Sequence, residues 1–332
     1  MSKTVRSGIL GLGMGANRAR MVPKTKGAEL VCVCDLQEEK ARQVAEELNC
    51  EWCTDYEKML AQEDIDAIGI FTSSGSHADY AIRAVEAGKH VFTTKPMDIS
   101  VKKCDELIEA ASKANLVLAV DFANRYLDDR RKVKLAIDSG QIGKIILADL
   151  RMKWYRTQEY YDSSYPSGWR SRRKTEGGSA ANQGVHYIDL LQWLVGPVKT
   201  VYGMSGTFTH KIETEDTSVA ILTFKNGAWG TLVTTTASIP DLGSVIEISG
   251  DNGSIIIKDR GVSLYHCKGK PDASLDEFTL PEDRPKNIIE DMVSAITKGM
   301  PVAVDGVEGR ESVKIFNAIY ESSRTGKPLK IK

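Results

Sequence analysis

The stretch Val5–Ala16, VRSGILGLGMGA, decides the first half of the fold. A short apolar run leads directly into a Gly-x-Gly-x-x-Ala pattern, which is typical of a strand that turns tightly into a helix. Gly11 permits the turn, Gly13 lets the phosphates of a ligand approach the backbone, and Ala16 allows close packing of the helix on the strand. The stretch predicts a dinucleotide site in a parallel α/β sheet, with Met14 and the start of the helix beside the pyrophosphate.

An acidic residue follows at the distance that such a site needs. The second apolar run ends at Asp35, where a carboxylate can accept hydrogen bonds from the ribose hydroxyls of a cofactor. A carboxylate there repels the 2′-phosphate of NADP, and the next residues, Leu36 and Gln37, supply no arginine. The two signals together predict NAD as the cofactor. The alternative is a glycine turn followed by a solvated aspartate.

The first 120 residues alternate apolar runs with amphipathic stretches, which is the pattern of parallel strands joined by helices. We expect strands near 5–11, 29–34, 66–71, 89–93 and 116–120, and helices at 36–48, 76–87 and 101–114. This predicts a doubly wound α/β domain of the Rossmann type over residues 1–122.

After residue 123 the sequence becomes rich in β-forming runs and turn signals. We expect strands at 145–154, 199–208, 218–224, 229–236, 245–249 and 254–258, with helices at 179–194, 287–298 and 307–324. Asn226-Gly227 and the stretch 251–253 fit tight hairpin turns. Residues 123–332 are therefore expected to form a second domain of the α+β class, around an open, largely antiparallel sheet that binds substrate and another subunit.

Composition excludes several classes of function. The chain has 332 residues, is 42% hydrophobic and 27% charged, and carries a formal net charge of -1, which gives no basic footprint for nucleic acid. No apolar leader opens the sequence and no stretch approaches the roughly 18 apolar residues of a membrane span, so we expect a cytoplasmic protein without a membrane partner. A small-molecule ligand is the favoured partner.

The six cysteines are scattered along the chain. Cys50 and Cys53 have the spacing of a redox or zinc pair, but no second pair or nearby histidine completes a tetrahedral site. Cys32 and Cys34 alternate within an expected strand. We favour small, buried side chains and expect no metal.

The segment 88–96, GKHVFTTKP, resembles the AGKHVxxEKP signature of the Gfo/Idh/MocA family, the glucose-fructose oxidoreductases and inositol dehydrogenases. The resemblance covers essentially the whole chain and includes the glycine turn, the helix start at Asp55, His77 and the string GGSAANQGVH that ends at His186. It implies a nicotinamide cofactor, a sugar, inositol or nucleotide-sugar substrate, and a homodimer or homotetramer built through the second sheet. The cofactor contacts that it adds to the glycine turn and Asp35 are Ser73, His77, Thr94, Lys95 and Asn124.

Two positions depart from the family pattern. Thr94 stands where the family usually has a glutamate, and Asn182 stands where it usually has an aspartate four residues before the histidine. The string around Asn182 and His186, with Trp169 and Arg170 upstream, is similar to members that oxidise the 3-hydroxyl of a hexopyranose, nucleotide-sugar 3-dehydrogenases included.

Removal of a hydride from a carbon that carries a hydroxyl needs a base for the hydroxyl proton. Lys95 follows the fourth expected strand at its carboxyl end, the edge where open α/β sheets bind ligands. A partly desolvated lysine has a lowered pKa and can act as base or as proton donor, whereas a solvated strand-end lysine is the alternative. The resemblance suggests that the bond between Lys95 and Pro96 is cis.

Asn182, His186 and Asp189 are spaced at i, i+4 and i+7, so one helix face can bring them together. We predict that His186 is the general base, that Asn182 hydrogen-bonds the substrate or the imidazole, and that Asp189 binds substrate or orients His186. Apolar residues follow beside the same stripe, so a helix with a satisfied core histidine is the alternative.

Aromatic and cationic residues fill the segment before this helix. Trp154 and Trp169 can stack on the apolar face of a sugar, and Arg156 and Arg170 can bind a phosphate or carboxylate. A phosphorylated or acidic sugar is therefore a candidate substrate, while a solvated surface or a subunit contact is the alternative. The resemblance also implies that Arg125 contacts the substrate.

These residues predict an NAD-dependent dehydrogenase that acts on a secondary hydroxyl of a sugar or polyol. A second hypothesis is a lyase or glycosidase that retains NAD and oxidises the sugar only transiently. A third is a non-catalytic dinucleotide sensor, against which Lys95 and His186 argue. Net formation of reduced nicotinamide separates the first two hypotheses.

Overall fold

The computed structural model describes residues 4–163 and 165–331, and the chain divides into two compact units. The N-terminal unit comprises Met1–Ala123 and Pro285–Arg310, and the C-terminal unit comprises Asn124–Arg284 and Glu311–Lys332. The first break falls next to the expected boundary of 122, but residues 285–310 had been expected in the second domain. They return to the N-terminal unit because α9 (Ile288–Lys298) buries its apolar face against β1, β2 and β6.

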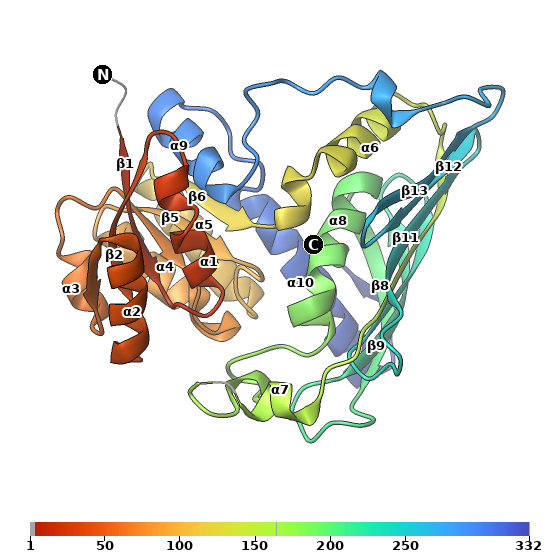
Figure 1. Ribbon diagram of the computed structural model, residues 1–332. Coiled ribbons are helices and arrows are strands. Elements are labelled where there is room, and N and C mark those ends of the chain that lie inside the picture. The colour runs from red at the N-terminus through yellow and green to blue at the C-terminus, as the bar shows by residue number, and fades with distance from the viewer. Residues whose placement is uncertain (1–3, 164, 332) are drawn as a thin grey trace. The chain divides into compact units, whose positions relative to one another are not determined.

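The N-terminal unit is built on a parallel sheet, in which Figure 1 labels β1, β2, β5 and β6, and the strand order in the described chain is β3-β2-β1-β4-β5-β6. Its strands are β1 (Val5–Leu10), β2 (Ala28–Cys34), β3 (Glu51–Cys53), β4 (Ala67–Ile70), β5 (His90–Thr94) and β6 (Leu118–Asp121). Its helices, besides α9, are α1 (Gly15–Ala19), α2 (Glu38–Leu48), α3 (Tyr56–Leu60), α4 (His77–Glu86) and α5 (Val101–Lys113). The strands up to β3 are added on one side of β1, and the strands from β4 onward are added on its other side. Ligands bind in such sheets at this change of side, between β1 and β4.

Local sequence signals account for the ends of these helices. The Asp55 side chain accepts a hydrogen bond from the backbone N–H of Glu57 at the start of α3, and Ser100 does the same for Lys103 at the start of α5. The left-handed residue Asn49 ends α2. The predicted Rossmann-type domain is therefore confirmed, with β3 as an additional short edge strand.

The C-terminal unit is built on a mixed sheet with the order β13-β12-β11-β7-β10-β9-β8-β14 in the described residues. Its strands are β7 (Ile145–Lys153), β8 (Val198–Gly206), β9 (Thr217–Phe224), β10 (Trp229–Thr235), β11 (Gly243–Gly250), β12 (Gly253–Lys258), β13 (Gly261–Cys267) and β14 (Leu329–Lys330). Neighbours pair antiparallel except β7 with β10, so the largely antiparallel sheet is confirmed.

Helices cover one face of this sheet. They are α6 (Asp128–Asp138), α8 (Val185–Val195) and α10 (Gly306–Thr325), of which α10 starts before the division at residue 310, whereas the short α7 (Gln158–Asp162) contacts the turn Trp169–Ser171. The contacts of α8 with β7 and β11 place it across the middle of the sheet, and Figure 1 shows it there. Sequence patterns had not indicated α6, α7 or β13.

The predicted helix at 179–194 has a different first turn. Residues Ala180–Gly184 form a π-helix that runs directly into α8, closed by a 2.7 Å hydrogen bond from the Gly184 N–H to the Ser179 carbonyl. A Cβ atom at Gly184 would lie 2.6 Å from Cγ2 of Thr234 on β10, so the helix approaches the sheet closely here. The expectation of one continuous α-helix is therefore wrong in its first turn.

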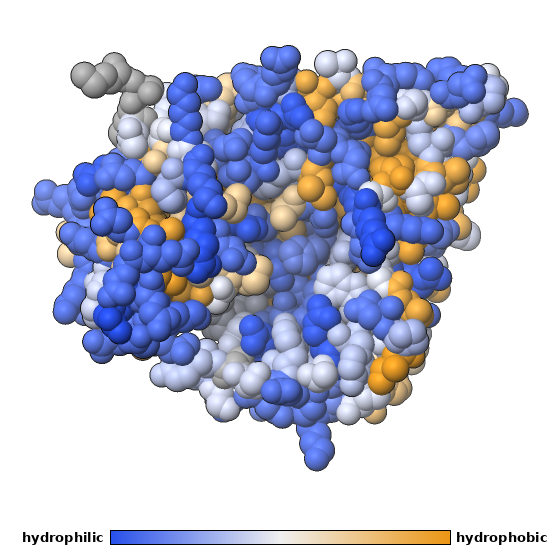
Figure 2. Space-filling model, viewed as in Figure 1, coloured by the Kyte–Doolittle hydropathy of each residue, from blue (hydrophilic) through white to orange (hydrophobic). Residues whose placement is uncertain are grey.

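The opposite face of the sheet carries exposed apolar side chains because alternate residues of each strand point outward. Figure 2 shows apolar side chains along the sheet side of this unit. Those with large exposed fractions are Trp229 (68%), Met204 (66%), Ile221 (59%), Ile146 (57%) and Tyr202 (45%). We call these five residues the outer-face patch.

Among the residues that the structure describes, no helix combines the length and the apolar character that a membrane span requires. The cytoplasmic location stays a prediction.

Candidate functional site

The glycine turn after β1 has the geometry that a bound dinucleotide requires. Gly11 has a φ of +84°, and a Cβ atom there would lie 2.5 Å from the carbonyl oxygen of Phe71. Gly13 has nothing within 4 Å of a Cβ position, so its backbone is open to a ligand. Ala16 is buried under the turn, and Met14 beside it is 63% exposed. The turn therefore offers bare backbone to a phosphate group.

Asp35 is fixed at the end of β2, next to this turn. Its Oδ2 accepts a 2.7 Å hydrogen bond from the Leu12 N–H, and its Oδ1 accepts a 2.9 Å hydrogen bond from the Gln37 N–H. Because each carboxylate oxygen has two lone pairs, Asp35 can still accept from two ribose hydroxyls. Lys40 Nζ lies 3.9 Å from Oδ2. The turn and this carboxylate fit the ribose and pyrophosphate of a dinucleotide.

The predicted cofactor residues of the N-terminal unit follow the ends of parallel strands, so they share one edge of the sheet. Ser73 follows β4, Thr94 ends β5 and Lys95 comes next, and all three are partly exposed. The hydroxyl of Ser73 lies 3.0 Å from that of Ser76. The bond between Lys95 and Pro96 is cis, as expected.

His77 corrects one prediction. It had been expected to contact the cofactor, yet it is 1% exposed, and its ring nitrogens lie 2.7 Å from the Pro96 carbonyl and 3.0 Å from the Thr72 carbonyl. Burial lowers the pKa of His77, and the nearby charge of Lys95 acts in the same direction, against the raising effect of the two carbonyls. His77 therefore ties together the loops that follow β4 and β5.

The predicted catalytic residues of the C-terminal unit lie at the junction of the π turn and α8. Asn182 belongs to the π turn and His186 to the first turn of α8, and both are partly exposed although most of their neighbours are buried. Asn124 donates a 3.4 Å hydrogen bond from Nδ2 to the His186 carbonyl. Asn124 is thus linked to the His186 helix and is partly exposed, and its expected contact with the cofactor stays a prediction.

Arg125 and Asp189 are not free for a substrate. Nε and Nη2 of Arg125 donate to the two carboxylate oxygens of Asp189, each over 2.8 Å, and the side chains are 1% and 0% exposed. The guanidinium also lies 4.8 Å from the ring centroid of Trp193. Both had been predicted as substrate contacts, but the Nε–Nη2 edge of the Arg125 guanidinium already binds the carboxylate of Asp189. The pair holds the segment after Ala123 on α8.

The aromatic and cationic residues before the helix form one cluster. The Arg156 guanidinium lies 5.0 Å from the ring centroid of Trp154, and that of Arg170 lies 4.7 Å from Trp169 and 4.8 Å from Tyr160. Arg156 also approaches the Tyr160 ring, at 5.7 Å. The aromatic and cationic residues of this stretch are thus neighbours, as expected from the sequence, and Tyr160 joins the two pairs.

Gln183 connects this cluster to the helix and had not been predicted. Its Nε2 donates a 2.9 Å hydrogen bond to the Tyr160 hydroxyl. Burial raises the pKa of Tyr160, so the hydroxyl is neutral and can accept this bond. The cluster therefore contacts the π turn that carries Asn182.

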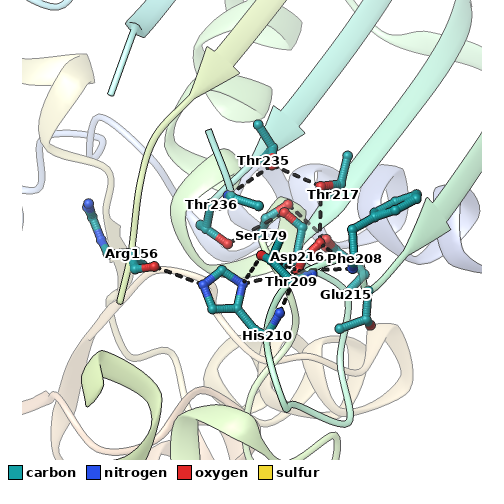
Figure 3. A network of polar contacts seen from close by, with 12 residues as sticks. Arg156, Ser179, Phe208, Thr209, His210, Glu215, Asp216, Thr217, Thr235 and Thr236 are labelled. Carbon is teal, nitrogen blue, oxygen red and sulfur yellow. Dashed lines mark hydrogen bonds and ion pairs between the residues drawn. The ribbon is translucent and has the colours of Figure 1, made fainter. Parts of the chain in front are cut away.

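Two buried carboxylates next to the π turn had also been missed (Figure 3). Glu215 accepts hydrogen bonds from the Ala180 N–H and the Ser179 hydroxyl, both over 2.8 Å. Burial raises the pKa of Glu215 to about 7. Asp216 accepts from the backbone N–H groups of a neighbouring loop. The only sequence signal was a polar Thr-Glu-Asp-Thr run just before a strand.

The cysteines behave mostly as expected. Cys32, Cys34, Cys104 and Cys267 are buried, but Cys50 and Cys53 are partly exposed, which the prediction of buried side chains did not anticipate. Cys32 Sγ lies 3.9 Å from Cys53 Sγ. Within the described ranges, no group of three or more His, Cys, Asp or Glu side chains is arranged to hold a metal ion.

Comparison with known proteins finds a family match for each of the two units. Residues 5–122 match the oxidoreductase family with an NAD-binding Rossmann fold, and residues 130–256 match the GFO/IDH/MocA C-terminal domain. The chain belongs to the Gfo/Idh/MocA oxidoreductase family. The N-terminal unit is the NAD(P)-binding Rossmann domain of this family.

Three individual proteins illustrate the range of relatives. The WlbA dehydrogenase of Bordetella pertussis, solved in complex with NADH and UDP-GlcNAcA, is 30% identical with a TM-score of 0.90 and covers 99% of both chains. The scyllo-inositol 2-dehydrogenase (NAD(+)) of Bacillus subtilis is 26% identical over 100% of this chain and 97% of its own. The 2,7-anhydro-N-acetylneuraminate hydratase of Mediterraneibacter gnavus is 29% identical over 61% of this chain and 53% of its own.

Proposed function

We propose that this protein is an NAD-dependent dehydrogenase that oxidises a secondary hydroxyl of an acidic sugar or nucleotide sugar, at C3 of the pyranose ring. One observation carries the proposal. The Gln183–Tyr160 hydrogen bond joins the turn of Asn182 to a cluster of aromatic rings and arginines. The proposed general base His186 and a surface suited to a charged sugar would thus be carried by connected segments of one unit.

The residues have separate tasks in this reaction. When bound, NAD would supply a nicotinamide that accepts the hydride. The neutral imidazole of His186 would take the hydroxyl proton, and Asn182 would hydrogen-bond a neighbouring hydroxyl or the imidazole itself. Lys95, in the N-terminal unit, would act as a base or as a proton donor to a carbonyl oxygen. Trp154 and Trp169 would hold the ring by stacking.

Charge supports an acidic substrate. Arg156 and Arg170 lie over aromatic rings, which leaves planar guanidinium edges suited to a carboxylate or phosphate. The related WlbA structure contains UDP-GlcNAcA, a nucleotide sugar, which favours this substrate class. Asp35, at the ribose position, favours NAD over NADP.

The proposal is tested with a panel of sugars. Neutral hexoses, inositols, uronic acids and UDP-linked uronic acids are incubated with NAD, and the absorbance of reduced nicotinamide is followed. We expect the UDP-linked acids to be the best substrates. If every compound fails with wild-type protein, or only neutral polyols react, the assigned substrate class is wrong.

A second candidate is an enzyme that retains NAD and oxidises the sugar only transiently. The similarity to a 2,7-anhydro-N-acetylneuraminate hydratase favours it, because a hydratase adds or removes water rather than catalysing net oxidation. In that case the substrate is consumed while no reduced nicotinamide accumulates. Quantifying substrate and reduced nicotinamide in one reaction separates the two candidates.

We also propose that the protein forms a homodimer or homotetramer through the outer-face patch. Large apolar side chains on five positions of strands β7 to β10 are exposed on one sheet face, which is unusual for the surface of a monomer. A second copy of the same chain would cover them with an equally apolar surface.

A further inference from the structure

The consecutive residues Glu215 and Asp216 lie between the two segments that carry the proposed substrate contacts of the C-terminal unit (Figure 3). They stand directly before β9 and are 7% and 0% exposed. The reaction described above gives neither of them a task. Buried carboxylates are costly unless hydrogen bonds stabilise them, so their partners indicate what they hold in place.

Glu215 holds the start of the π turn. Its Oε1 accepts hydrogen bonds from the Ala180 N–H over 2.8 Å and from the Tyr320 hydroxyl over 2.9 Å, and its Oε2 accepts one from the Ser179 hydroxyl over 2.8 Å. The backbone also pairs, because the Ser179 N–H donates to the Glu215 carbonyl over 3.0 Å. The last of these anchoring residues is two positions before Asn182.

Gly178 makes this close approach possible. A Cβ atom there would lie 2.3 Å from the Glu215 carbonyl oxygen and 2.4 Å from its carboxyl carbon. The Gly178 N–H donates to the Tyr320 hydroxyl over 3.2 Å, so α10 joins the same contact. Residues before and within the π turn, together with Tyr320 of α10, thus contact Glu215 closely.

Asp216 holds a different segment. Its Oδ2 accepts from the backbone N–H groups of Thr209 and His210 over 2.9 and 3.2 Å, and Phe208 N–H lies 3.1 Å from both oxygens. Burial raises the pKa of Asp216, but the N–H groups of Thr209, Phe208 and His210 outweigh it and leave the pKa below its usual range. Asp216 is therefore ionised and fixes the loop of His210.

His210 passes this restraint on to Arg156. Its Nδ1 lies 3.1 Å from Oδ2 of Asp216, and its Nε2 lies 2.8 Å from the Arg156 carbonyl. On the other side, the Arg156 N–H donates to the Thr236 carbonyl over 2.8 Å, and the Thr236 N–H donates to the Asp216 carbonyl over 2.9 Å. The backbone of Arg156 is therefore clamped between two segments that both contact Asp216.

We propose that Glu215 and Asp216 are positioning residues that set two parts of the substrate site independently. Glu215 sets the helix start that carries Asn182 and His186, and Asp216, acting through His210, sets the loop that carries Arg156. The first affects the geometry of proton transfer, and the second affects how tightly the charged group of the substrate is held. For its kinetic readout this inference rests on the proposed function.

The experiment compares kcat and KM in matched variants. Glu215→Ala is expected to lower kcat about 10- to 100-fold with KM within about 3-fold, because small misplacements of a catalytic group cost about that much. His210→Ala is expected to raise KM about 10-fold with kcat within about 3-fold, the loss expected for a weakened charge-assisted contact. Glu282→Gln, an exposed position of the same unit, is the control and should match wild type.

Milder variants guard against loss of folding. Glu215→Gln keeps the size of the side chain and an acceptor oxygen, and should retain kcat within about 3-fold, whereas Tyr320→Phe removes one donor and should lower kcat by about 3- to 10-fold. A purely structural role predicts that both kinetic constants change together in every variant. That result, or wild-type kcat in both Glu215→Ala and Tyr320→Phe, would overturn the inference.

Amide hydrogen exchange tests the positioning roles of Glu215 and His210 without any enzymatic activity, so it can fail or succeed independently of the proposed function. Peptides that cover residues 179–190 should lose protection in Glu215→Ala, and peptides that cover 153–163 should lose it in His210→Ala. This holds even if wild-type protein oxidises no sugar in the panel. Loss of protection in both segments in both variants would contradict the independent positioning of the two parts.

Discussion

Asp35 is the side chain on which the proposed preference for NAD over NADP rests. Its carboxylate is held by the N–H groups of Leu12 and Gln37, so it cannot swing away from the ribose position without breaking two hydrogen bonds. A 2′-phosphate would meet this fixed negative charge. The carboxylate was identifiable from the sequence because the glycine turn and the second strand fix its place in the order of residues.

We expect Asp35→Ala to weaken NAD binding by about 10-fold and to reduce the preference for NAD over NADP, since hydroxyl-to-carboxylate hydrogen bonds of about 1.5–3 kcal/mol are lost. Isothermal titration with NADH and NADPH measures both effects. Glu38→Ala, an exposed position three residues further on, is the matched control. Unchanged selectivity in Asp35→Ala would refute the cofactor assignment.

His186 is the proposed base for the hydroxyl proton. We expect His186→Asn to lower kcat by about 10²- to 10⁴-fold while NADH affinity is retained, because a positioned base contributes about that much. His266→Asn removes an exposed histidine of the same unit and serves as the control. Steady-state kinetics that find equal activity in His186→Asn and His266→Asn would remove His186 from the mechanism.

Glu215 makes stability depend on pH. Its pKa is raised to about 7 in the folded protein by burial, above the value of about 4.3 in an unfolded chain. The folded state therefore favours the protonated carboxyl, so the free energy of unfolding falls as pH rises from about 4.5 to 7, by roughly 3 kcal/mol from this group. Glu215→Gln cannot ionise and should lack this loss.

Urea unfolding at pH 5 and at pH 8 tests this expectation. The difference in unfolding free energy between the two pH values should be smaller in Glu215→Gln than in wild type. The other ionisable groups are common to both proteins and cancel in the comparison. Parallel pH dependence in the two proteins would mean that Glu215 titrates at its ordinary pKa in the fold.

The helices and strands differed in how clearly their sequences predicted them. The strands β1, β2, β4 and β5 were predicted within one or two residues because each is a short, mostly apolar run between turn signals. β3 has three residues, none of them buried, and so gives no apolar pattern. α6 is rich in charged residues, and its buried positions include Arg130, which hid its amphipathic face.

Site predictions failed where the partner is distant in sequence. Arg125 and Asp189 are 64 residues apart, and nothing in either local sequence indicates that they bind each other. The π turn likewise depends on contacts with Glu215 and Thr234, which belong to other strands and loops. Local patterns placed His186 on a helix but could not give the hydrogen-bonding register of the turn before it.

We expect Gly184→Ala to destabilise the C-terminal unit by about 1–3 kcal/mol, because the added methyl group would lie 2.6 Å from Cγ2 of Thr234. Thr234→Ser removes that methyl carbon, so the double variant should recover part of the loss. Urea unfolding of both single variants and the double variant measures the coupling. Simple additivity of the two single effects would show that Thr234 does not crowd the π turn.

The outer-face patch is the proposed contact between subunits. A charge in the middle of an apolar interface is strongly unfavourable, so Trp229→Glu should shift the protein to a smaller oligomer. Ile239→Glu introduces the same charge at a loop residue that is 77% exposed and outside the patch, and should leave the oligomer intact. Sedimentation velocity at several concentrations measures the difference. A wild-type monomer would contradict the proposed interface.

We propose that this Gfo/Idh/MocA protein moves a hydride from a sugar ring to NAD. The most direct measurement uses a UDP-linked uronic acid with deuterium at every ring carbon, followed by mass spectrometry of the nicotinamide. We predict that wild-type protein releases reduced nicotinamide that carries deuterium, and that His186→Asn forms it about 10²-fold more slowly. Conversion of the sugar by wild-type protein without deuterium in the nicotinamide would contradict net oxidation of the sugar by NAD.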